Sequence, residues 1–127
     1  MYTYQASTDG KTWRTITHIS EIDDDLNQLT LGNADILLLT STPEIDGINT
    51  IQADGVKIWD GIFKKRNIRT CHTIEILKWD EANNEKIYRH HTEDYNELYT
   101  IFENYIMHQS LPAYERWEDA TNDILGR

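Results

Sequence analysis

The side chains of this 127-residue chain that could do chemistry are its histidines, its one cysteine and its many carboxylates. None of the histidines stands at the spacing of a known metal-binding motif; they are His18, His72, His90, His91 and His108. His90 and His91 fall in a predicted strand, where adjacent side chains point to opposite faces and are poorly placed to share one metal ion. The histidines therefore predict no metal site, and nothing else in the chain predicts a cofactor.

Cys71 could act as a nucleophile only if a base reached its sulfur, and its neighbour His72 diverges from it on a predicted strand. We interpret Cys71 as a core or half-buried residue. The chain contains no Gly-rich phosphate loop, no His-Glu-x-x-His zinc helix and no Gly-x-Ser-x-Gly nucleophile elbow. The sequence therefore predicts a protein without catalytic residues, although its many carboxylates leave a paired-carboxylate hydrolase open.

The charge of the chain limits the partners that it can bind. Its 12 Lys and Arg residues against 22 Asp and Glu residues give a net charge of −10. This charge repels nucleic acid phosphates and anionic lipid surfaces, so we expect neither nucleic acid nor membrane as a partner. A basic protein is the partner that the charge favours. Acidity also keeps proteins soluble, which is an explanation that needs no partner.

Length and composition indicate one folded domain over residues 1–127, because 39% hydrophobic and 10% aromatic residues are ordinary for a globular protein. One cysteine allows no intramolecular disulfide, which favours a reducing compartment. The first five residues hold no basic segment that leads into an apolar stretch, and the longest apolar run covers only residues 36–39. We expect a cytoplasmic protein with no membrane-spanning segment.

The elements that must position any site begin with a predicted hairpin of residues 2–7 and 12–19, turning at Asp9-Gly10. Ser20 is predicted to cap a helix over residues 20–31, which Gly32 ends. Residues 34–40 read as a strand buried on both faces, with 36–39 in the core, and residues 48–53 as another strand.

The second half of the chain predicts more strands and a long helix. Residues 56–63 form a strand with a bulge or turn at Asp60-Gly61, residues 68–79 the longest strand, and residues 86–91 its hairpin partner. Asp94 and Glu97 form a capping box that starts a helix. Its apolar stripe consists of Tyr95, Leu98, Ile101, Phe102, Tyr105 and Ile106. The predicted fold class is α+β, a hairpin-rich antiparallel sheet of about five to seven strands with this C-terminal helix packed on one face.

Some aromatic residues lie beside carboxylates at irregular points of the chain. Buried aromatics at the centre of an interface carry affinity, and charges around them steer a partner of opposite sign. We therefore predict a partner-binding surface formed by Asp23, Asp24, Asp25, Glu44, Asp46, Trp59 and Asp60. Core packing is the competing interpretation of each tryptophan, and complementing a helix dipole is that of the acidic run at 23–25.

The last sixty residues of the chain resemble small bacterial immunity proteins that are encoded beside polymorphic or contact-dependent toxins. The resemblance is carried by residues 74–80, by the Ile87-Tyr88 strand, by the helix of residues 95–105, and by the ending from Leu111-Pro112 to residues 117–119. It implies a non-catalytic protein that binds a cognate toxin and occludes its active site. A basic toxin, such as a nuclease, would suit an acidic inhibitor.

Two other functions stay open at this point. The first is a small-ligand or enzymatic domain whose pocket is built from dispersed residues. The second is carbohydrate binding through Trp13 and Trp59, since residues 7–13 resemble the turn of Asp-box repeats and of discoidin-type carbohydrate-binding domains.

Overall fold

A computed structural model describes the backbone of residues 1–55, 57–61, 64–79, 81–82 and 84–121, and it describes no side chains for residues 57–61 and 64–71. The strands are β1 (Thr3–Ser7), β2 (Arg14–Ile16), β3 (Ile36–Thr42), β4 (Ile48–Asp54), β5 (Lys57–Gly61), β6 (Lys64–Trp79), β7 (Glu85–Thr92) and β8 (Glu118–Asp119). The helical elements are η1 (Ile19–Ile22), α1 (Asp23–Leu31), α2 (Tyr95–His108) and η2 (Tyr114–Arg116).

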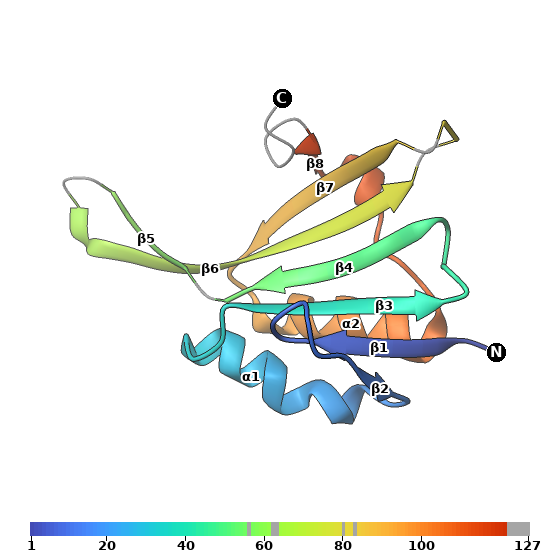
Figure 1. Ribbon diagram of the computed structural model, residues 1–127. Helices are drawn as coiled ribbons and strands as arrows, with labels where there is room; N and C mark the ends of the chain where they lie inside the picture. Colours follow the sequence, from blue (N-terminus) through green and yellow to red (C-terminus); the bar gives the residue numbers. More distant parts are fainter. Residues whose placement is uncertain (56, 62–63, 80, 83, 122–127) are drawn as a thin grey trace.

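All the strand pairs are antiparallel, and the sheet has the order β2-β1-β3-β4-β6-β7-β8, while β5 pairs with β6 alone. Both long helices lie on one face of this sheet (Figure 1). The predicted α+β class, with an antiparallel sheet and the C-terminal helix packed on one face, is confirmed.

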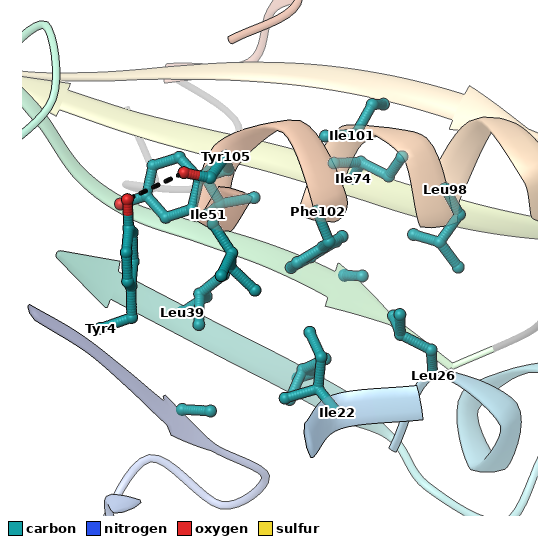
Figure 2. Packing of buried hydrophobic residues seen from close by; sticks show 14 of the residues in the cluster. Tyr4, Ile22, Leu26, Leu39, Ile51, Ile74, Leu98, Ile101, Phe102 and Tyr105 are labelled. Carbon is teal, nitrogen blue, oxygen red and sulfur yellow. Dashed lines mark hydrogen bonds between the residues drawn. The ribbon is translucent and has the colours of Figure 1, made fainter. Parts of the chain in front are cut away.

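The core lies between the sheet and the two helices (Figure 2). On β3, Leu37 and Leu39 are fully buried, whereas Ile36 and Leu38 on the other face are only half-buried. The expectation of a strand buried on both faces is therefore wrong, because helices cover one face of the sheet and leave the other without a helix. The apolar stripe of α2 packs as predicted, with five buried residues that are Leu98, Ile101, Phe102, Tyr105 and Ile106.

The first helical region begins differently from the prediction. His18, not Ser20, caps η1, since its side chain accepts a hydrogen bond from the backbone N–H of Ser20. The α-helix follows from Asp23 with no side-chain cap of its own. Gly32 ends it in the left-handed conformation at φ 79°, as its position predicts.

The start of α2 confirms half of the predicted capping box. The Asp94 carboxylate accepts a hydrogen bond from the N–H of Asn96. The N–H of Asp94 donates to the Thr92 hydroxyl at 3.0 Å rather than to Glu97. Glu97 is thereby left to reach across to β7, where its Oε1 lies 3.1 Å from Nε2 of His90.

Strand β6 extends well beyond the body of the sheet (Figure 1). Its residues 72–79 pair with β7, whereas the preceding residues up to Cys71 pair only with β5. At about 3.3 Å per residue, residues 64–71 form an arm of roughly 25 Å. The register shifts between Trp59 and Gly61, which confirms the predicted irregularity at Asp60-Gly61.

None of the helices in the described part of the chain is long and apolar enough to cross a membrane.

Candidate functional site

The acidic run of the predicted surface lies at the start of α1, and each of its carboxylates has a neighbour within the chain. Asp25 forms an ion pair with Arg14, and Asp24 accepts a hydrogen bond from Gln28 at 3.3 Å. Asp23 faces the second helix, where its carboxylate adds to burial in raising the pKa of Tyr99. Much of this negative charge is therefore used inside the fold.

Glu44 and Asp46 lie in the connection between β3 and β4. Glu44 is exposed, whereas Asp46 ties this connection to the C-terminal segment. The Tyr114 hydroxyl donates to Asp46 at 2.6 Å and accepts from Lys78 Nζ at 2.7 Å. The hydrogen bond to Tyr114, and then the Asp46 carboxylate, raise the pKa of Lys78, so the ammonium stays charged. Asp46 thus belongs to an internal network.

Trp59 and Asp60 lie on β5, in the arm, and their side chains are outside the described residues. Strand β4 separates them from Asp46, since the chain enters β4 at Ile48 and leaves it for β5 after Asp54. Seven residues of strand span roughly 23 Å. The structure therefore divides the predicted surface among the start of α1, one end of the sheet and the arm. Contact of any of these residues with a partner stays a prediction.

A groove runs along the outer side of α2, between this helix and the segment that follows it. We call it the acidic groove. Its volume is about 390 Å³, and its lining consists of Asp94, Asn96, Glu97, Thr100, Ile101, Asn104, Leu111 and Pro112. The chain returns along the helix because Gln109 adopts a left-handed conformation, at φ 52°, directly after the last helical residue. Two carboxylates, two amides and an apolar wall thus face one space, and no lining residue is basic.

The charge of the acidic groove persists near neutral pH. The Thr92 hydroxyl, and then His90, lower the pKa of Glu97 by hydrogen bonding to its carboxylate. His90 is in turn held by Trp117, whose ring stacks on the imidazole at 4.9 Å between centroids. Strand β7, helix α2 and the C-terminal segment therefore fix Glu97 from three directions. A preorganised carboxylate beside an apolar wall suits a cationic side chain with an aliphatic stem, as in Lys or Arg.

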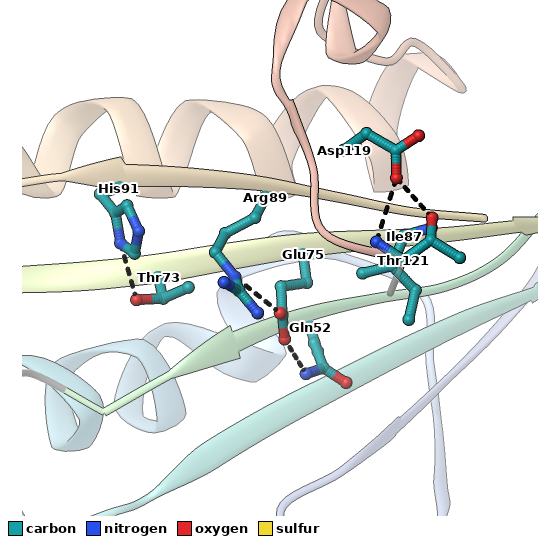
Figure 3. Close-up of polar contacts among 8 residues, drawn as sticks. All are labelled: Gln52, Thr73, Glu75, Ile87, Arg89, His91, Asp119 and Thr121. Carbon is teal, nitrogen blue, oxygen red and sulfur yellow. Dashed lines mark hydrogen bonds and ion pairs between the residues drawn. The ribbon is translucent and has the colours of Figure 1, made fainter. Parts of the chain in front are cut away.

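The helix-free face of the sheet carries a polar cross-strand row (Figure 3). Glu75 is only 4% exposed there, and it accepts hydrogen bonds from Gln52 at 2.5 Å and from Arg89 at 3.1 Å. Nearby, Thr73 lies 3.0 Å from His91. Because Glu75 finds both of its partners within the chain, this row is explained by folding alone. In the described residues, no group of three or more His, Cys, Asp and Glu could hold a metal ion.

The turn that resembles an Asp-box closes on itself. Asp9 accepts hydrogen bonds from the N–H groups of Lys11 and Thr12, both at 2.8 Å, and Ser7 accepts from Gly10. These bonds lower the pKa of Asp9. Trp13 beside this turn is 37% exposed. The side chain of Trp59, the second residue of the carbohydrate hypothesis, is outside the described residues.

Sequence reasoning missed the acidic groove because it gave Asp94 and Glu97 only a capping role. The available signal was Glu97, which a helix can start without, together with Leu111-Pro112, which returns the chain past its own helix. That return depends on tertiary packing, since Tyr114 is buried against the sheet and contacts Tyr88 at 5.3 Å between ring centroids.

Comparison with known proteins found no matching family model, no matching curated protein and no matching solved structure.

Proposed function

We propose that this chain is an immunity protein that binds a cognate bacterial toxin and neutralises it, with the acidic groove taking a basic segment of the toxin. The observation that carries the proposal is the pairing of Asp94 and Glu97 with the apolar wall of Ile101, Leu111 and Pro112. The net charge of −10 supports the same partner, because it steers a basic protein toward this surface. The occlusion of a toxin active site follows from the resemblance to immunity proteins.

The groove offers a basic side chain two kinds of contact. Ile101, Leu111 and Pro112 can cover the aliphatic stem, and Glu97 can pair with the charged head. A charge-assisted hydrogen bond that excludes water contributes more than an exposed ion pair, for which about 0–1 kcal/mol is usual. We expect the rim charges to set the association rate and the covered contacts to set the dissociation rate.

The test is protection of cells that express the toxin domain encoded beside this chain. The groove variant is Asp94→Asn with Glu97→Gln, which removes two charges and keeps a residue that can cap the helix. We expect the parent to protect, and the groove variant to bind the toxin at least about tenfold more weakly. The matched control is Asp35→Asn with Glu81→Gln, two exposed carboxylates outside the groove, and it should protect as well as the parent.

Each outcome of this test decides a separate part of the proposal. A parent chain that neither protects cells nor binds the toxin would refute the immunity function. A groove variant that protects fully would instead place the interface elsewhere, with the acid run of α1 and the exposed Glu44 as the next surfaces to neutralise.

A small cationic ligand is the second candidate, because a volume of about 390 Å³ lies within the range of small-molecule sites. Spermidine is a suitable probe. If the groove is a ligand site, spermidine should raise the melting temperature of the parent and leave that of the groove variant unchanged. An equal response of both variants would reduce the effect to nonspecific charge.

A further inference from the structure

The arm formed by β5 and residues 64–71 of β6 differs in charge from the rest of the protein. It holds five of the 12 Lys and Arg residues and one carboxylate, Asp60; the basic residues are Lys57, Lys64, Lys65, Arg66 and Arg69. The remaining 7 basic and 21 acidic residues give the rest of the chain a net charge of −14. A net charge of −10 therefore conceals a basic arm that projects from an acidic body (Figure 1).

The acidic groove begins at the same end of the sheet from which the arm projects. His72, where β6 enters the body of the sheet, pairs with Thr92 at the end of β7. Asp94 follows two residues later and lines the groove with Glu97. The basic element and the acidic groove are therefore neighbours at one end of the molecule.

The arm is poorly placed to enter the groove of its own chain. Strand β6 is continuous from Lys64 to Trp79, so the arm extends the plane of the sheet. The groove lies on α2, on the helical side of that sheet (Figure 1). Folding the arm back onto α2 would require a break in β6 and the loss of ladder hydrogen bonds, each of which costs about 0.5–1.5 kcal/mol.

We propose that this chain forms a reciprocal homodimer in which the basic arm of each copy lies in the acidic groove of the other. Because arm and groove share one end of the molecule, a twofold axis at that end lets both contacts form at once. The charge of the second copy makes it the occupant, since its groove carries Asp94 and Glu97 and no basic residue. Nucleic acid is disfavoured, because the phosphates that the arm attracts are repelled by the body of −14.

The experiment measures the mass of the chain alone, by sedimentation equilibrium over a dilution series. We expect a dimer whose Kd rises at least about tenfold between about 50 and about 500 mM NaCl, because screening weakens contacts between exposed charges. The arm variant Lys64→Gln, Lys65→Gln, Arg66→Gln and the groove variant Asp94→Asn, Glu97→Gln should both be monomers under conditions in which the parent is a dimer.

The matched control is Lys11→Gln, Lys86→Gln, Arg116→Gln, which changes the net charge as much as the arm variant but leaves the arm intact. It should remain a dimer. A second pair of variants keeps the proposal testable if neutralisation alone has a weak effect. Mixing Lys64→Glu, Lys65→Glu with Asn96→Lys, Glu97→Lys should give a mixed dimer through the reversed pair, while the arm-reversed chain alone stays monomeric.

A parent that is monomeric throughout the dilution series overturns the proposal. So does a groove variant that dimerises as tightly as the parent, because the arm would then bind elsewhere. Binding of a fluorescein-labelled DNA duplex that the arm variant loses and the groove variant keeps would assign the arm to nucleic acid instead. Because these measurements use no toxin, their failure leaves the proposed immunity function to its own test, and success would make the toxin segment and the partner's arm competitors for one groove.

Discussion

At the scale of single residues, two buried tyrosines in contact have hydroxyl groups with different surroundings. The Tyr4 hydroxyl donates to the backbone carbonyl of Tyr105 at 3.0 Å and accepts from Gln109 (Figure 2). Among the described residues, the Tyr105 hydroxyl has no hydrogen-bond partner, since the nearby Ser41 donates to the carbonyl of Pro43 instead. Burial raises the pKa of Tyr105 to about 12.

We predict opposite outcomes for removing these two hydroxyl groups. Tyr4→Phe leaves a buried carbonyl without its donor and should lower the free energy of unfolding by about 1–2 kcal/mol. Tyr105→Phe removes a polar group that has no partner and should leave stability unchanged or raise it by up to about 1 kcal/mol. Urea denaturation of both variants measures the difference, and an equal loss in both would show that the Tyr105 hydroxyl has a partner after all.

At the scale of elements, the start of α2 serves both the fold and the acidic groove. Asp94 caps the helix, and the same carboxylate lies at the groove rim. We predict that Asp94→Ala lowers the free energy of unfolding by about 1 kcal/mol, because the N–H of Asn96 loses its acceptor. Asp94→Asn should be nearly neutral, since asparagine caps as well as aspartate. Equal stabilities of the two variants, by urea denaturation, would contradict the capping role and leave Asp94 to the groove.

At the scale of the whole molecule, the shifted pKa values define a pH range of greatest stability. Hydrogen bonds lower the pKa of Asp9, Glu97 and Asp119, so their contribution is present above the ordinary carboxyl values and is lost as pH falls through the lowered ones. Burial raises the pKa of Tyr105 from 10.0 to about 12, so its contribution is present below pH 10 and is lost as pH rises toward 12.

We therefore predict a plateau of stability between about pH 5 and pH 10, with a decline on each side. Glu97→Gln should make the acid decline shallower, and Tyr105→Phe the alkaline one. Urea midpoints at a series of pH values measure both limbs. The prediction fails if either variant keeps the full slope of the parent on its own limb, because the titrating group would then be another residue.

The sequence by itself determined most elements of this fold, because their signals are local. The Asp9-Gly10 turn, the Gly32 stop and the Asp94 cap each depend on the conformation of a few neighbouring residues. The apolar stripe of α2 reports which face is buried, since side chains recur along a helix at a fixed period. These signals were sufficient to predict the α+β class and the packing of α2 on the sheet.

Tertiary structure alone decided where the charged groups meet. Leu38 is apolar yet half-buried and Glu75 is charged yet buried, because coverage of a sheet face depends on elements far away in the sequence. Asp46 and Trp59 are 13 positions apart, but β4 between them carries them to opposite ends of a strand. The net charge of −10 averages a basic arm with an acidic body. Only the pairing of β5 with β6 beyond the sheet separates the two in space, since charge has no local signal for where the backbone will carry it.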